Sequence, residues 1–423
     1  MTFPFSWNDL ADQPHNVAPK KERLRYHFKH TGSYLDLAAA NAALAVPVLR
    51  LYRRYSKMMH RRPVEIGSPF AVSCSPAGDH DDEVIGSLKA AGIRQTLVRV
   101  ASWERAALSR QADFIRRLHR EDFDVVCALL QRRDDVLDPS SWRGFLEDVF
   151  SALSPLCSYF EVGHAWNRTK WGVWDHREYI ALAGAAASLA GRHGVRLVGP
   201  AVIDFEFHLY PPTLRAVSFD KVSSLLYVDR SGAPENAQFG WTTAKKVALW
   251  KAVVDASLAE PRECWITEMN WPLEGAGKYS PAPGKPCVSE EVQANYLVRY
   301  FIICLAGGLV ERVYWWQLVS PGYGLIDSRP AKWRKRPSYH ALSQMTRLLE
   351  ASRFEGREAA GGAEIFRFQK GGREFAVCWT KSGAVEHTFS RPAVQVFDRD
   401  GRELPAGSAK IRMEEKPQYV FFR

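Results

Sequence analysis

The sequence predicts an α/β protein: a (β/α)8 TIM barrel with a helical basic N-terminal extension before it and a C-terminal antiparallel β-sandwich domain after it. Three observations support this. Buried apolar segments alternate with helical segments through residues 63–352, the pattern changes to short alternating strands in 353–423, and most of the net positive charge lies within the first 62 residues. The expected division is therefore an extension over 1–62, a barrel over 63–352 and a small β domain over 353–423.

The extension is strongly basic. Residues 20–62 contain eleven Lys or Arg against Glu22 and Asp36, a local charge of +9 where the whole chain carries +10. Apolar residues at helical spacing predict a helix here, which Pro47 is expected to kink or divide. Two interpretations stay open: a helix packed on the barrel with a solvated basic face, or an interfacial helix in peripheral contact with anionic membrane. A spanning helix is disfavoured, because Asp36, Asn41 and Pro47 interrupt the apolar run.

The barrel prediction rests on eight apolar strands, seven of them followed by a predicted helix, since buried apolar strands joined by helices indicate a parallel sheet. A doubly wound sheet is the alternative, but no GxGxxG opens a helix. The predicted strands are 69–75, 95–101, 122–131, 157–163, 195–201, 221–229, 263–271 and 311–319. The predicted helices are 81–92, 108–121, 141–154, 176–194, 242–258, 289–308 and 336–350.

The last part of the chain predicts a different architecture. Its apolar segments are short, several alternate with polar residues, and turn signals such as RDG separate them. They are 364–369, 374–380, 385–390, 394–401 and 417–423. This pattern is typical of a small antiparallel β-sandwich.

Composition and motifs exclude several classes. The seven cysteines form no CxxC pair and several lie in apolar runs, which indicates buried free thiols in a reducing compartment. No secretory signal is recognisable, so we expect a cytoplasmic protein, at the inner face of the membrane if the extension binds lipid. Metal-ligand spacing, a GxSxG elbow and a nucleic-acid motif are all missing, so no metal, no cofactor and no nucleic-acid partner are expected.

Polar and aromatic residues gather at the carboxyl ends of the predicted strands, where TIM barrels carry their chemistry. Rings stack on the apolar faces of sugars, and amides or charged groups bond sugar hydroxyls, so a carboxylate, Glu268, among such residues favours a carbohydrate cleft. Packing in the barrel core is the alternative for any single tryptophan. The candidates for lining sugar subsites are Arg99, Gln131, His164, Asn167, Tyr227, Asp229, Trp271 and Trp316.

Several of these segments resemble motifs of clan A glycoside hydrolases, close to the family of β-xylosidases, α-iduronidases and bacterial exopolysaccharide endoglycosidases. In that clan the fourth strand ends in a pattern like EVWNEPN, whose second acidic residue is the acid/base, and the seventh strand ends in the nucleophilic glutamate. FEVGHAWN at 160–167 is similar to the first, and WITEMNWP at 265–272 to the second. LVGPAV at 197–202 and YWWQLV at 314–319 also resemble family segments. The resemblance implies that Glu268 is the nucleophile.

The resemblance fails at the acid/base position. Ala165 stands where the family has its acid, His164 where it has asparagine, and Leu225 where it often has histidine. Retaining glycosidases use two carboxyl groups about 5–5.5 Å apart. General acid catalysis contributes about 10²–10⁴-fold, and Ala165 cannot supply it.

Three explanations stay open. The first is that Ala165 is an engineered substitution, and the second is that the chain is a natural pseudoenzyme. The third is that another residue donates the proton; the candidates are His164, Asp175, Glu206 and Asp229. The sequence thus predicts a retaining glycoside hydrolase acting on a bacterial polysaccharide or glycolipid glycan, with Glu268 as nucleophile and position 165 as the acid/base site. A noncatalytic glycan-binding protein on the same fold is the alternative.

Overall fold

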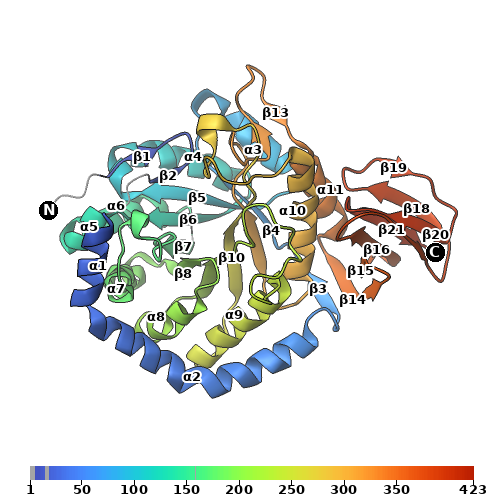
Figure 1. Ribbon diagram of the computed structural model, residues 1–423. Coiled ribbons are helices and arrows are strands. Elements are labelled where there is room, and N and C mark those ends of the chain that lie inside the picture. The colour runs from blue at the N-terminus through green and yellow to red at the C-terminus, as the bar shows by residue number, and fades with distance from the viewer. Residues whose placement is uncertain (1–4, 15–18, 158) are drawn as a thin grey trace.

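A computed structural model describes residues 5–14, 19–157 and 159–423, and it confirms the predicted fold class. Ser158 of the predicted fourth strand and residues 1–4 and 15–18 of the extension lie outside the described residues. Eight parallel strands close into a barrel at the centre of the molecule (Figure 1). In barrel order after β4 (Phe70–Cys74) they are β5 (Gln95–Ala101), β6 (Asp124–Leu130), β7 (Tyr159–Val162), β8 (Arg196–Ile203), β9 (Lys221–Leu225), β10 (Cys264–Met269) and β11 (Arg312–Trp315).

Helices cover the outside of this barrel. They are α3 (Asp81–Ala90), α4 (Leu108–Arg120), α5 (Arg133–Leu137), α6 (Pro139–Leu153), α7 (His176–His193), α8 (Tyr210–Ala216), α9 (Thr243–Ser257), α10 (Glu290–Leu305) and α11 (Pro337–Leu349). The sequence did not predict α8, which is short and has prolines as its second and third residues. Proline lacks an amide hydrogen, which the first helical turn does not need, so the pair suits the start of a helix.

The C-terminal domain is built mainly on one antiparallel sheet, to the right of the barrel in Figure 1. Its order is β19 (Glu403–Leu404), β18 (Ala393–Asp398), β21 (Gln418–Phe422), β16 (Arg373–Thr380), β15 (Ala363–Lys370), β14 (Ser352–Ala360) and β3 (Val64–Ile66). A second pair, β17 (Val385–Thr388) with β20 (Lys410–Met413), packs against it around Phe389 and Ile411. Strand β3 joins this sheet from the start of the barrel segment and so ties the two domains together.

The extension has two parts. Strands β1 (Trp7–Asn8) and β2 (Gln13–Pro14) form a hairpin, and α1 (Lys20–Lys29) and α2 (Thr31–Met58) follow. Helix α2 packs along α8 and α9 and curves around the lower edge of the barrel (Figure 1). It is continuous through Pro47, so of the two predicted effects of this proline, a kink or a division of the helix, the division does not occur.

The core has two layers that hold the strands in place. Apolar side chains fill the barrel interior, among them Leu97, Val126, Trp265 and Tyr314. A larger cluster lies between the strands and their helices. The seven cysteines are free thiols, six of them buried and Cys287 half-buried, which agrees with the expectation from the sequence.

Candidate active site

A cavity of about 660 Å³ opens at the carboxyl ends of the barrel strands. Glu268 lies in it near the end of β10, a strand whose residues are all buried. Five of the eight predicted sugar-binding residues line the same cavity, together with Glu268 and Ala165. They are Arg99, His164, Tyr227, Asp229 and Trp316. The structure therefore brings together residues from five different strand ends, as the barrel topology requires.

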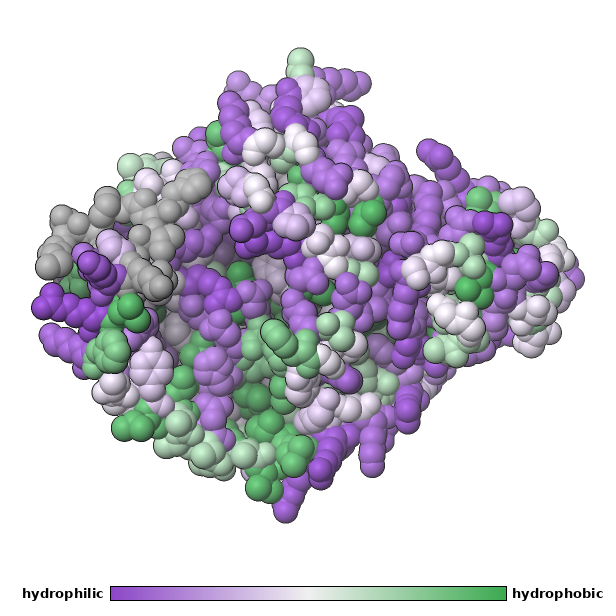
Figure 2. Space-filling model, in the orientation of Figure 1, coloured by the Kyte–Doolittle hydropathy of each residue, from purple (hydrophilic) through white to green (hydrophobic). Residues whose placement is uncertain are grey.

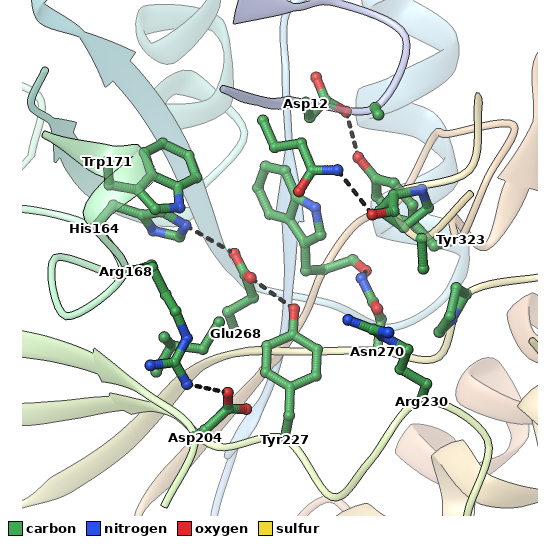
Figure 3. A pocket seen from close by; sticks show the side chains of 18 of the residues that line it. Asp12, His164, Arg168, Trp171, Asp204, Tyr227, Arg230, Glu268, Asn270 and Tyr323 are labelled. Atoms are coloured by element: carbon green, nitrogen blue, oxygen red, sulfur yellow. Dashed lines mark hydrogen bonds and ion pairs between the residues drawn. The ribbon is translucent and has the colours of Figure 1, made fainter. Parts of the chain in front are cut away.

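Two donors hold the Glu268 carboxylate. The Tyr227 hydroxyl donates a hydrogen bond to Oε1 at 2.6 Å (Figure 3). The Arg99 guanidinium forms an ion pair with Oε2. Burial and the charge of Glu268 raise the pKa of Tyr227, which keeps its hydroxyl protonated as a donor. Such charge-assisted bonds fix the orientation of the carboxylate. This arrangement suits a nucleophile.

Arg99 is itself held on several sides. Its guanidinium stacks 3.3 Å from the centre of the Trp316 ring, and its Nη2 atom lies 2.9 Å from His164 Nε2. Because arginine only donates, Nε2 of His164 accepts, which places the imidazole proton on Nδ1. Burial, with the charges of Arg99 and Lys170, lowers the pKa of His164 well below its usual value. The 3.5 Å separation between His164 Nε2 and Glu268 Oε2 is therefore a contact with a neutral ring.

Position 165 presents a methyl group to the cavity. Ala165 follows β7 in a left-handed conformation, with φ at +41°, and is almost completely buried. Of the proton donors considered from the sequence, only His164 and Asp229 line this cavity, and His164 is neutral. The Asp229 carboxylate accepts the backbone amide hydrogens of Ser231 and Gly232.

The other two donor candidates lie elsewhere. Asp175 caps the start of α7 by accepting the backbone amide of Arg177 at 2.8 Å. Glu206 forms an ion pair with Arg168 and is not among the lining residues. Of the four candidate donors, this cavity therefore contains only His164 and Asp229; its other lining carboxylates besides Glu268 are Asp12 and Asp204.

Three predicted sugar-binding residues are corrected by the structure, because none of them lines the cavity. Gln131 is fully buried and bonds the backbone: its amide donates to His164 O at 3.1 Å and Trp171 O at 3.0 Å and accepts from His164 N at 2.9 Å. Asn167 bonds both backbone groups of Ile203. These amides hold the loop after β7, which would otherwise leave polar backbone groups unpaired in the interior.

Trp271 is corrected for a related reason. Its indole nitrogen donates to Gly232 O at 3.0 Å, and its ring packs against Tyr296, Tyr300 and Trp315. Trp271 is thus a buried core residue, the alternative role that the sequence leaves open for any single tryptophan.

The N-terminal hairpin also contributes to the cavity, which no pattern in the sequence indicates. Asp12 lines the cavity, and its Oδ2 atom accepts a hydrogen bond from Tyr323 at 2.5 Å (Figure 3). The same atom accepts a hydrogen bond from Gln317 at 2.7 Å. Arg99 Nη1 donates to the Asp12 backbone oxygen at 3.2 Å. Burial raises the pKa of Asp12, against the hydrogen bond from Tyr323. The extension therefore is more than a packed helix: its first described residues help to build the site.

The hairpin is fastened on both sides of the cavity. Gln13 accepts from Lys170 Nζ at 2.5 Å and donates to Pro281 O at 2.8 Å. Trp7 packs against Trp103 and Trp171, with ring centres 5.1 and 5.9 Å apart. Other cavity residues not selected from the sequence are Arg168, Lys170, Asp204 and Arg230. Two-residue strands give no periodic signal, so the sequence could not place this hairpin.

Comparison with known proteins shows the fold. A scan of protein-family models and a search of curated protein sequences both find no match. Among solved structures, a family 39 glycoside hydrolase from Bacteroides cellulosilyticus WH2 matches with TM-score 0.67 and 15% identity, over 85% of this chain and 81% of that one.

Two further structures are similar over most of their length. A GH30 endoxylanase from Clostridium papyrosolvens C71 has TM-score 0.58 and 12% identity, over 86% of this chain and 98% of that one. A GH51 arabinofuranosidase from Xanthomonas axonopodis pv. citri has TM-score 0.57 and 11% identity, over 86% and 98%. The chain thus has the barrel-plus-sandwich fold of clan A glycoside hydrolases.

Proposed function

We propose that this protein is a retaining glycoside hydrolase whose nucleophile is Glu268 and whose acid/base position is occupied by Ala165. The observation that supports this most is the position of the Glu268 carboxylate, which Tyr227 and Arg99 hold in place at the end of β10 inside the cavity. In this mechanism a carboxylate attacks the anomeric carbon, and a glycosyl ester on Glu268 forms as the leaving oxygen departs. Water then hydrolyses that ester.

The loss of the acid decides which substrates can react. With no carboxyl group at position 165, a leaving group that needs a proton departs about 10²–10⁴-fold more slowly than it would with a general acid at that position. A leaving group that is stable as an anion does not need that proton, so Glu268 can still form the ester. The proposed natural substrate is a bacterial polysaccharide or glycolipid glycan.

The second candidate is a noncatalytic glycan-binding protein, and Ala165 is the observation that favours it. The cavity retains Trp316, Asn270 and several charged groups that could bond a sugar, while one of two catalytic groups is missing. Both candidates predict glycan binding, and they differ in whether a covalent ester forms on Glu268.

We propose a cytoplasmic location as well. The seven free thiols support it, because disulfides are rare in reducing compartments. Contact with the inner face of the membrane rests on the surface of α1 and α2 and is independent of the chemistry at Glu268.

Covalent trapping tests the main proposal. A panel of 2-deoxy-2-fluoro glycosides with dinitrophenolate or fluoride leaving groups, in both anomeric series, should add one glycosyl unit to the protein. Intact-mass spectrometry should show the adduct, and peptide mapping should place it on Glu268. Glu268→Gln should remove the adduct, whereas Glu274→Gln, at an exposed carboxylate on the loop after the same strand, should keep it. Glycan binding with no adduct from any member of the panel would favour the binding protein.

A further inference from the structure

The exposed side of helix α2 is unusually apolar. Between residues 38 and 49 every exposed residue is apolar, and the two largest, Val46 and Leu49, are 59% and 46% exposed. We call these residues the apolar strip: Ala38, Ala39, Ala42, Ala43, Ala45, Val46, Pro47 and Leu49. Figure 2 shows hydrophobic surface along the lower edge of the molecule, where α2 runs. A surface helix normally turns polar side chains outward.

The inner side of the same helix is already occupied. Asn41 donates to the His208 backbone oxygen at 2.8 Å, the Tyr55 hydroxyl bonds Asp255, and the Tyr52 ring packs 5.4 Å from Trp241. Asn41, Tyr52 and Tyr55 of α2 therefore face the barrel, while the apolar strip faces outward. Burial in the described structure does not explain the strip.

Basic residues flank the strip on both sides. Arg50, Arg53, Arg54, Lys57, Arg61 and Arg62 are exposed after it, and Lys21, Arg25 and Lys29 are exposed on α1 before it. None of these nine forms an ion pair with a described residue. The carboxylate of Asp36, between the two groups, is already paired with Arg177. Positive charge is thus free to meet an anionic surface along the whole edge.

Helix α1 extends the apolar surface. Phe28 is 77% exposed and Leu24 is 47% exposed, and Leu35 at the start of α2 is 72% exposed. These large side chains lie among the basic residues of α1, as in helices that enter the boundary between lipid headgroups and acyl chains.

We propose that α1 and α2 dock the protein on an anionic lipid bilayer, with the apolar strip at the acyl boundary and the basic residues on the headgroups. Helix α2 has 28 residues, about 42 Å in length, and is long and apolar enough to cross a membrane. Its contacts with α8 and α9 hold it against the barrel, so it lies along the surface. An anionic lipid bilayer offers both complementary features at once: an apolar layer for the apolar strip and negatively charged headgroups for the basic residues.

Vesicle co-sedimentation tests this surface with point variants, because deleting the extension would also remove Asp12 from the cavity. The full chain is mixed with phosphatidylcholine vesicles and with vesicles containing phosphatidylglycerol. We expect binding to the anionic vesicles at low salt, a fall as NaCl screens the charges, and little binding to the neutral ones. Absence of binding to anionic vesicles at low salt would overturn the proposal.

Two variants test the two components. Replacing Arg53, Arg54 and Lys57 with glutamine should lower the partition coefficient roughly a hundredfold or more. Val46→Gln with Leu49→Gln should lower it at least about tenfold, because the lost contacts are apolar. Each variant has a matched control in the C-terminal domain. The control for the basic residues replaces the exposed Arg373, Arg402 and Arg412 with glutamine. The control for the apolar residues is Val394→Gln, at a valine that is 47% exposed.

The controls should bind like the parent chain. Equal losses in the control variants would contradict a specific face. The strip could instead cover a second copy of the chain: self-association that Val46→Gln with Leu49→Gln abolishes, without vesicle binding, would replace the membrane with that partner. Thermal unfolding of every variant checks that the fold is retained.

Discussion

Glu161 allows a quantitative test of the charge arrangement beneath the site. It lies on β7 inside the barrel and is fully buried, and burial together with the Glu268 charge raises its pKa to about 7 from an ordinary 4.5. The folded state therefore holds a proton that the unfolded chain releases between pH 4.5 and 7. By linkage, the free energy of unfolding falls across this interval, in total by about 3 kcal/mol for this group.

Glu161→Gln removes the titration while keeping the shape of the side chain. The free energy of unfolding, from urea titrations at intervals between pH 4 and 8, should be similar for the two proteins at or below pH 4.5. The parent chain should then lose about 3 kcal/mol relative to the variant by pH 7, with no further divergence above it. Parallel curves, or a parent chain that gains stability relative to the variant as pH rises, would refute this reasoning.

Three further results are expected. Ala165→Glu should raise hydrolysis of unactivated glycans about 10²–10⁴-fold by supplying the missing acid, measured as released reducing sugar; no gain would favour a binding protein. Gln131→Leu should lower the free energy of unfolding by about 2–5 kcal/mol, because it leaves backbone groups near His164 unpaired, and denaturant titration checks this. Tyr227→Phe should slow the trapping of Glu268 about 10–100-fold without abolishing it, since Arg99 still holds the carboxylate; unchanged trapping kinetics would contradict the role of this hydrogen bond.

The sequence predicted the barrel because each of its strands is an apolar run of the length of a strand, and each long helix has apolar residues at helical spacing. It also located the ends of β7 and β10, and thereby placed Ala165 and Glu268 at one cavity. Position at a strand end does not fix where a side chain points. Gln131 and Asn167 sit where predicted, yet their amides turn to the backbone, since the loop after β7 has polar groups to satisfy.

Other features depend on contacts between distant segments. Asp12 accepts hydrogen bonds from Gln317 and Tyr323, which lie more than 300 residues further along the chain. No local sequence pattern indicates such a pairing. Helical periodicity reveals that α2 has two kinds of face but does not say which one meets the barrel. The structure shows that polar residues such as Asn41 and Tyr55 face inward.

The central claim is that Glu268 still attacks sugar while position 165 has lost its acid. Azide rescue tests it most directly, with a dinitrophenyl glycoside as substrate and the configuration of the product read by nuclear magnetic resonance. Ala165 and Glu268 line the same cavity, and the account requires azide to enter beside the Ala165 methyl, on the face of the sugar opposite Glu268. We predict a glycosyl azide that keeps the anomeric configuration of the substrate, because two inversions occur, and no such product from Glu268→Gln. An azide of inverted configuration, or equal product from Glu268→Gln, would contradict the account.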